Sequence, residues 1–159
     1  MYLKRPEAQG TTRQRSRILT LDSNVLVAAL KEDEPYSVQC SEILGKVPDQ
    51  FILSEPCIVY QEVCGTLARR VGAEVADDAK KQLDRFIHPS LLVDCDRAFC
   101  VSAYPLCSEY RIYAIDAMYL KTAFDNRAIL VSLDKEDFID KVNSKGSDIE
   151  AYHVSQFTY

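Results

Sequence analysis

Short apolar segments alternate with longer amphipathic segments along most of the chain. Apolar runs with the length of buried strands occur at 18–21, 51–53, 91–93 and 128–133. Between these runs, apolar residues recur at helical spacing, which predicts helices over 25–30, 36–46, 54–70, 73–86, 96–109, 115–126 and 135–142. The last stretch, 149–157, alternates only in part and is expected to form an edge strand.

Two helix boundaries are predicted from local signals. Ser54 precedes Glu55 and Pro56, and a serine followed by proline in the first turn is typical of a helix start. His88, beside Pro89, is interpreted as a cap or surface residue at the end of the following helix rather than as a ligand.

The order of elements predicts an α/β fold. Strands separated by helices of ten or more residues are typical of βαβ units, which form a parallel sheet with helices on both faces. Ligands of such sheets bind outside the carboxyl ends of the strands. Residues 17–159 are therefore expected to form a single domain, preceded by a flexible basic arm over residues 1–16 that has almost no apolar content.

Composition places the chain among ordinary globular proteins. It has 159 residues, of which 47% are hydrophobic and 27% charged. No apolar run approaches the length of about 18 residues that a membrane span requires, and no signal-peptide pattern is present at the N-terminus. A cytoplasmic location without membrane contact is expected.

Charge is distributed unevenly. The net charge is −5, but residues 1–17 hold five basic residues and one acidic residue, so the rest of the chain carries −9. Such a body does not attract nucleic acid broadly, because that affinity comes from many Lys and Arg contacts to phosphates. A polyanion would have to bind at one local site, for example through divalent cations held by acidic groups.

Cysteine and histidine give no metal-binding pattern. The six cysteines form no CxxC pair, and the two histidines lie far from any such spacing, which makes a zinc site improbable. Spacing alone does not exclude disulfides, but the cysteines are interpreted as small core residues in a reducing compartment.

Two aspartates directly follow apolar strands. Asp22 ends the run at 18–21 and Asp134 ends the run at 128–133, so both are expected at the same edge of a parallel sheet. An aspartate in this position is also a common turn or helix cap, so neither residue indicates chemistry on its own.

Two further acids lie on helices. Asp116 shares a helix face with Tyr119, Leu120 and Ala123, where an ionised carboxylate needs a cation or several donors, although it also suits the first turn of the helix. Glu62 borders the apolar arc of its helix, and pairing with Arg69 is the alternative to a place in a cleft.

The four acids are more informative together than apart. A parallel sheet can bring Asp22, Asp116 and Asp134 to one rim with Glu62 beside them, and clustered carboxylates repel one another unless hard cations lie between them. Mg²⁺ and Mn²⁺ prefer such oxygen ligands. Ions there would support metal-assisted hydrolysis of a phosphodiester.

Four segments in the expected order resemble the PIN-domain nuclease family, and in particular the VapC-like ribonuclease toxins. The resemblance covers about residues 18–142, and its first and last segments are the more specific. The segments are Leu21-Asp22-Ser23-Asn24-Val25-Leu26-Val27, Tyr60-Gln61-Glu62-Val63, Ala114-Ile115-Asp116-Ala117, and Ile129-Leu130-Val131-Ser132-Leu133-Asp134 with Asp137-Phe138. The arm before Ile18 is longer than usual for these toxins, and the segment after Lys141 matches nothing specific.

This resemblance implies a three-layer α/β/α sandwich and cleavage of RNA that depends on Mg²⁺ or Mn²⁺. It assigns both catalysis and metal binding to Asp22, Glu62, Asp116 and Asp134. Asn24 and Ser132 match polar positions that support such a site, and we expect them to orient carboxylates or metal-bound water. Asp137 is a substitute for Asp134 or assists it, and Asp134 is preferred.

Several alternatives stay open at this stage. A phosphatase of the haloacid-dehalogenase type also opens with a strand ending in Asp, but it needs a second Asp where Asn24 stands. A receiver domain would need an early acidic pair that is missing. A PIN-like module that only binds proteins, or a PIN nuclease in RNA processing rather than a toxin, remains compatible with the sequence.

Partners follow from the same hypothesis. The expected substrate is RNA, with a small antitoxin protein as a possible partner and a homodimer as a possible assembly. Arg111, Lys121 and Lys135 lie in or near the segments that carry the acids and are the proposed RNA contacts. Arg127 and the pair Arg69 and Arg70 are further candidates.

Overall fold

The structure, a computed structural model, describes residues 17–159. The basic arm expected over residues 1–16 lies outside the described residues.

Within residues 17–159, five parallel strands form one sheet. They are β1 (Arg17–Leu21), β2 (Phe51–Pro56), β3 (Ile87–Val93), β4 (Ile129–Ser132) and β5 (Ala151–His153), in the order β3-β2-β1-β4-β5. Strand β4 is buried along its whole length and β1 over its last three residues, which their apolar runs predict. The expected edge strand near the C-terminus is present as β5, although it is only three residues long.

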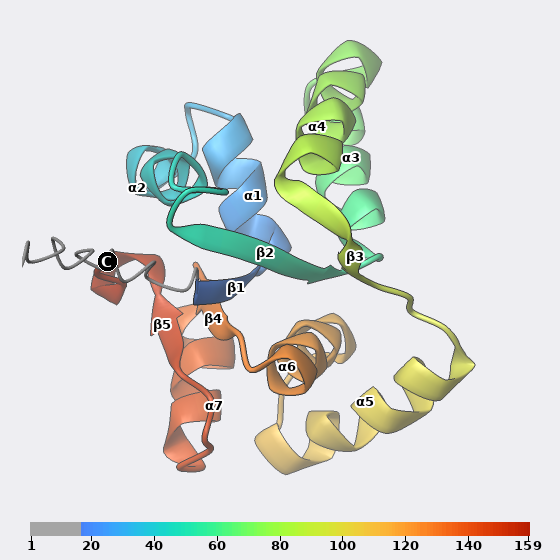
Figure 1. Cartoon of the computed structure of the whole chain (residues 1–159), viewed down its shortest axis with the longest axis vertical. Helices are drawn as coiled ribbons and strands as arrows, with labels where there is room; N and C mark the ends of the chain where they lie inside the picture. The colour runs from blue at the N-terminus through green and yellow to red at the C-terminus, as the bar shows by residue number, and fades with distance from the viewer. Residues whose placement is uncertain (1–16) are drawn as a thin grey trace, which may run out of the picture.

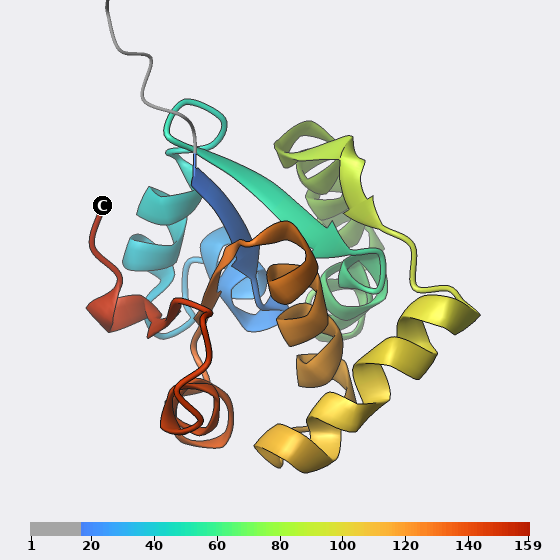
Figure 2. The same ribbon diagram turned by 60° about the horizontal axis from the view of Figure 1, so that its bottom comes forward.

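Helices cover both faces of this sheet, as Figure 1 shows. One face carries α1 (Ser23–Leu30), α2 (Ser37–Leu44), α3 (Val59–Arg70) and α4 (Ala73–Phe86), and the other carries α5 (Arg97–Tyr110), α6 (Ala114–Asn126) and α7 (Asp140–Ser144). Figure 2 shows α5 lying alongside α6 at the outer side of the second layer. The predicted α/β/α sandwich with a parallel central sheet is therefore confirmed.

The two helix layers bury two separate apolar clusters. Leu26, Val63 and Leu83 belong to the cluster on the side of α1–α4, while Tyr119 and Leu120 of α6 belong to the cluster on the other side. Apolar burial on both faces of the sheet is the main favourable contribution to folding. It also fixes α3 and α6, the helices that carry Glu62 and Asp116, on opposite faces of the sheet.

The helix start predicted at Ser54 is wrong. Residues Ser54, Glu55 and Pro56 end β2, and α3 begins at Val59. Glu55 and Pro56 pair with Leu92 and Val93 of β3, and pairing within a buried sheet overrides the local serine-proline signal. Proline is tolerated here because it is the last residue of the strand.

The other predicted helix and strand boundaries differ from the observed ones by a few residues. Two further predictions, at His88 and over 135–142, are corrected by the structure. Strand β3 begins at Ile87 rather than near 91, so His88 lies in a strand, where its exposed ring contacts Ser90 Oγ, and not at a helix end. The segment predicted as a helix over 135–142 divides into the π-helical turn η1 (Lys135–Ile139) and α7.

The cysteines are free thiols, and only one of them lies in the core. Cys40 is buried as expected, whereas Cys100 is exposed and the remaining four are partly exposed. In the part of the chain that the structure describes, no helix combines the length and the apolar character needed to cross a bilayer.

Candidate active site

The carboxyl ends of β1 and β4 place Asp22 and Ser132 side by side. Leu21 of β1 is in register with Val131 of β4, and the amide of Asp22 donates to the carbonyl of Val131 at 2.9 Å. Parallel neighbouring strands end at the same edge of a sheet, so the residues that follow them meet there. This is the edge at which the sequence predicts chemistry.

A compact hydrogen-bond network holds the carboxylate of Asp22. Its Oδ2 atom accepts hydrogen bonds from Ser132 Oγ at 2.6 Å and from Asn24 Nδ2 at 2.7 Å. Asn24 Oδ1 in turn accepts from the amide of Leu133 at 3.0 Å. Asn24 and Ser132 thus make the contacts that an orienting role requires, because both hold the same carboxylate oxygen.

Asp134 is connected to the same network but lies nearer to solvent. Its amide donates to Ser132 Oγ at 2.9 Å, and its Oδ1 atom caps the turn η1 by accepting from the amide of Asp137 at 2.9 Å. The carboxylate of Asp137 is exposed and accepts from Lys141 Nζ at 2.9 Å. Asp134 therefore combines the capping role with a place beside Ser132, whereas Asp137 points to a lysine.

Glu62 and Asp116 approach this edge from the two helix layers. Each is partly exposed, and each keeps one buried carboxylate oxygen, Glu62 Oε2 and Asp116 Oδ2, without a hydrogen-bond partner among residues 17–159. A buried carboxylate oxygen without a donor is costly. Each side chain therefore keeps one oxygen that can accept from a donor or bind a cation.

Burial and mutual repulsion shift the protonation of two of these acids. Burial raises the pKa of Asp22 to about 7; the Ser132 hydrogen bond opposes this rise, and the charges of Asp116 and Glu62 add to it. Burial likewise raises the pKa of Asp116 to about 6, opposed by a hydrogen bond from the Tyr113 amide and supported by the charges of Asp134 and Glu62. These mutual effects mean that the four predicted acids share one electrostatic environment.

The three basic residues proposed as RNA contacts differ in their surroundings. Lys121 pairs with Asp125, and Lys135 pairs with Asp140 at 2.7 Å. Arg111 is exposed and directly follows α5, close in sequence to the first turn of α6, which carries Asp116. The described ion pairs include none between Glu62 and Arg69.

Two of the further arginines considered as RNA contacts are less suited to that role, one because of its distance from the acids and one because of an ion pair. Arg127 follows the far end of α6, about 16 Å along the helix axis from Asp116. Arg70 at the end of α3 pairs with Glu34.

Sequence reasoning missed three residues near the acids. Glu55 is fully buried, Tyr119 keeps a buried hydroxyl, and the positive charge of Lys141 lowers the pKa of Asp116. Burial first, and then the negative charges of Glu55 and Glu62, raise the pKa of Tyr119. Only Lys141 had a usable signal, namely its spacing of four residues from Asp137.

The residues present fit a hard divalent cation. All four acids offer oxygen ligands, and two of them hold unpartnered buried oxygens, which is the chemistry that Mg²⁺ and Mn²⁺ prefer. Across residues 17–159, however, no three acidic, histidine or cysteine side chains are already arranged at metal-binding distances. An ion would therefore have to draw these carboxylates closer together.

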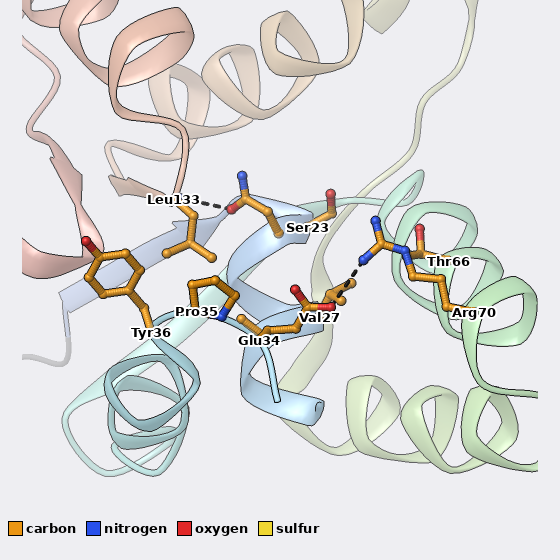
Figure 3. Close-up of a pocket in the computed structure, with 10 residues that line it drawn as sticks. Ser23, Val27, Glu34, Pro35, Tyr36, Thr66, Arg70 and Leu133 are labelled. Atoms are coloured by element: carbon orange, nitrogen blue, oxygen red, sulfur yellow. Dashed lines mark hydrogen bonds and ion pairs between the residues drawn. The ribbon is translucent and has the colours of Figure 1, made fainter. Parts of the chain in front are cut away.

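A pocket of about 440 Å³ opens beside this network. Ser23 and Asn24 of α1 and Leu133 form part of its wall, and Figure 3 shows Tyr36 at one end and Thr66 and Arg70 at the other. The ion pair between Arg70 Nη1 and Glu34 Oε1, at 3.2 Å, lies in the wall between them. The pocket adjoins the residues that follow Asp22, so it extends the acidic edge towards α2 and α3.

Comparison with known proteins gives one family and several structural relatives. The profile of the PIN domain matches residues 19–144. No curated protein matches the chain.

Three solved structures illustrate the likeness. The sarcin-ricin loop cleaving toxin VapC20 of Mycobacterium tuberculosis is 14% identical, with a TM-score of 0.60 over 75% of this chain and 91% of that one. VapBC2 of Rickettsia felis, bound to a DNA fragment from its promoter, is 13% identical, with a TM-score of 0.60 over 86% and 98%. FitAcB of Neisseria gonorrhoeae is 17% identical, with a TM-score of 0.59 over 88% and 99%. At these identities the likeness shows a shared fold.

Proposed function

Because the chain belongs to the PIN domain family, we propose that it is a metal-dependent endoribonuclease that uses Asp22, Glu62, Asp116 and Asp134 as its active site. The coarser conclusion, a nuclease, is supported by the family match and by a fold shared with VapC toxins. The finer assignment to these four residues rests on their geometry and chemistry.

One observation carries the proposal. Four carboxyl groups, two from the segments that follow β1 and β4 and two from α3 and α6, influence one another electrostatically, and two of them keep buried oxygens without donors in the described part of the chain. Asp22 is buried and the other three acids are partly exposed, and neighbouring carboxylates with buried oxygens repel one another unless their charge is neutralised. Mg²⁺ or Mn²⁺ held by Asp22, Glu62, Asp116 and Asp134 would neutralise them, and would supply Lewis acidity towards a phosphodiester.

The residues around Asp22 prepare its carboxylate for this role. Ser132 and Asn24 both donate to Oδ2, so the group cannot rotate freely. Fixing a ligand before the reaction lowers the cost of organising the site in the transition state. We assign Asn24 and Ser132 to this orienting role. We assign Asp137 only an assisting role, because its carboxylate is already paired with Lys141.

Asp116 is the best candidate to receive a proton from the attacking water. One of its carboxylate oxygens has no hydrogen-bond partner among residues 17–159, so that oxygen can accept a proton. In the proposed reaction, the water oxygen bonds to phosphorus and one water proton passes to the carboxylate. The bond between phosphorus and the leaving ribose oxygen breaks, and that oxygen takes up a proton from solvent. Lys141, whose charge acts on Asp116, is positioned to oppose the negative charge of the phosphate.

RNA binding must be local, because most of the molecule is acidic. We propose that Arg111, Lys121 and Lys135 contact the RNA backbone, with Arg111 the most available because the two lysines already pair with aspartates. Exposed ion pairs are weak enough to exchange for phosphate contacts.

We further propose that the nuclease is the toxin of a toxin–antitoxin pair in the cytoplasm, inhibited by a small antitoxin protein. The solved structures that support this role include a toxin and a complex named VapBC2. An antitoxin that places Arg or Lys among the four acids would neutralise them as a cation does. Homodimerisation belongs to the same proposal.

RNA cleavage by the full chain tests the proposed activity. We expect cleavage with Mg²⁺ or Mn²⁺, loss of cleavage with EDTA, and a fall of about 100-fold or more for Asp22→Asn. Asp78→Asn is the matched control, because Asp78 is an exposed acid on α4 whose ion-pair partner in the described part of the chain is Lys81. Equal cleavage in all samples would remove the nuclease proposal and favour a module that only binds proteins.

Expression in cells separates a toxin from a nuclease of RNA processing. We expect the wild-type chain to arrest growth and Asp22→Asn to permit it, and we expect a small protein encoded beside the chain to copurify and restore growth. Cleavage in vitro without growth arrest would contradict the toxin role while leaving the nuclease intact.

A further inference from the structure

A fifth acidic residue lies buried behind the proposed active site. Glu55, on β2, has a fully buried side chain, and its Oε1 atom accepts a hydrogen bond from the backbone amide of Leu21 at 2.8 Å. Glutamate is almost never fully buried without a partner that compensates the cost. Leu21 immediately precedes Asp22, so this bond reaches the backbone of the acidic edge.

The hydrogen bond between the Leu21 amide and Glu55 stands where a backbone hydrogen bond between β1 and β2 would otherwise lie. Backbone pairing between β1 and β2 runs from Arg17 and Phe51 to Leu19 and Leu53, and two side-chain bonds follow it. Thr20 Oγ1 donates to the carbonyl of Ser54 at 2.8 Å, and the Leu21 amide donates to Glu55.

An irregularity in the neighbouring strand pair accompanies this change. The register between β2 and β3 shifts between Leu53 and Glu55, at the same place along β2. On the other side of β1, pairing with β4 continues through Leu21. The last peptide of β1 is therefore held by a strand on one side and by the Glu55 side chain on the other.

We propose that Glu55 is a positioning residue that fixes the last peptide of β1 and thereby sets the direction in which Asp22 presents its carboxylate to the cation. This inference rests on the proposed function, because it assigns a role in that same site. Glu55 is not a catalytic residue, since its whole side chain is buried: Oε1 accepts from the Leu21 amide, and Oε2 is enclosed without a partner among residues 17–159.

The state of the Glu55 carboxyl supports this role. Burial raises its pKa well above the ordinary value, and the charge of Asp22 adds to the rise while the Leu21 hydrogen bond opposes it. A neutral carboxyl still accepts through its carbonyl oxygen, as the amide of glutamine does. Glutamine is therefore expected to replace Glu55 in function.

Three variants of the full chain test the proposal. Glu55→Gln keeps an acceptor for the Leu21 amide, and Glu55→Met keeps the approximate volume but removes the acceptor. Thr20→Val is the matched control, because it removes the other buried side-chain bond between β1 and β2, one residue further from Asp22. Amide hydrogen exchange at Leu21, Mn²⁺ affinity and RNA cleavage are measured for each.

In Glu55→Met, we expect the amide hydrogen of Leu21 to exchange with solvent at least about ten times faster than in the wild type, because this donor loses its acceptor. We expect the variant's Mn²⁺ affinity and its kcat to fall about ten-fold or more, as for residues that orient metal ligands, with KM for RNA little changed. Glu55→Gln and Thr20→Val should keep a Mn²⁺ affinity within about two-fold of the wild type. If Glu55→Met does not fold, Glu55→Asp, whose carboxyl is one methylene shorter, takes its place.

Two results would overturn the proposal. Wild-type Mn²⁺ affinity and cleavage in the variant without the acceptor would show that the bond does not position Asp22. Equal impairment of Glu55→Gln would show that the charge of Glu55, and not its acceptor, is required. A wild-type chain that neither binds Mn²⁺ nor cleaves RNA would instead refute the proposed function, and Leu21 exchange would still report on the hydrogen bond.

Discussion

At the scale of single residues, one hydroxyl group connects the two strands that carry the site. Ser132 Oγ donates to Asp22 Oδ2 at 2.6 Å and accepts from the amide of Asp134 at 2.9 Å. It therefore holds two of the four acids at once. Its hydrogen bond also opposes the rise in the pKa of Asp22 that burial causes.

Replacing this hydroxyl is expected to impair the site and leave the fold intact. Ser132→Ala should lower kcat/KM for RNA about 10- to 100-fold, the usual cost of removing a group that orients a metal ligand. Ser90→Ala is the control, because Ser90 is exposed and its hydroxyl contacts the ring of His88, away from the acids. Steady-state cleavage measures both variants, and a Ser132→Ala enzyme as active as the wild type would remove the orienting role.

At the scale of elements, helix α6 divides its surface between the site and the core. Asp116 lies in its first turn, Leu120 is fully buried, and Lys121 forms an ion pair with Asp125. Burial of the apolar face fixes the helix on the sheet and thereby carries Asp116 to the acidic edge. In this helix, Leu120 therefore contributes to stability and Asp116 to the chemistry of the site.

Two neighbouring substitutions on α6 are expected to have very different effects on stability. Leu120→Ala should lower the free energy of unfolding by about 2–5 kcal/mol, because it leaves a cavity in the core. Lys121→Ala should change it by less than about 1 kcal/mol, because the lost ion pair is partly exposed. Urea unfolding measures both, and similar losses for the two variants would contradict this assignment of the helix faces.

The sequence predicts positions at strand ends better than positions that depend on how helices pack on the sheet. The sequence predicts that Asp22 and Asp134 lie at one edge of the sheet, because each follows a strand and parallel strands end at the same edge. The approach of Glu62 and Asp116 depends on helix packing across two layers, which periodicity does not define. The sequence predicts Glu55 in a helix because Ser54 and Pro56 resemble a helix start, and a buried acid in a strand departs from the usual hydrophobic pattern.

At the scale of the whole molecule, the buried acids couple stability to pH. Folding raises the pKa of Asp22 to about 7 and that of Asp116 to about 6, chiefly through burial. Between the unfolded values near 4 and these folded values, the folded chain binds more protons than the unfolded chain. Stability without metal should therefore fall as pH rises through this window and level off above about pH 7.

Thermal unfolding from pH 4 to 8 measures this effect. We expect Asp22→Asn to flatten the decline, which amounts to a few kcal/mol at most. Mg²⁺ should stabilise the wild type more at pH 8 than at pH 5, because the ion binds ionised carboxylates. Stability that rises from pH 4 to 7 without metal, in the same way for wild type and Asp22→Asn, would contradict the shifted pKa values.

The account depends most directly on whether the four acids bind a divalent cation together. Calorimetric titration of the full chain with Mn²⁺ at pH 7.5 tests this point for the wild type and for Asp116→Asn, with Asp78→Asn as the control. We predict saturable binding to the wild type and the control, weakened about ten-fold or more by Asp116→Asn. Absence of saturable binding, or binding that Asp116→Asn leaves unchanged, would contradict the account.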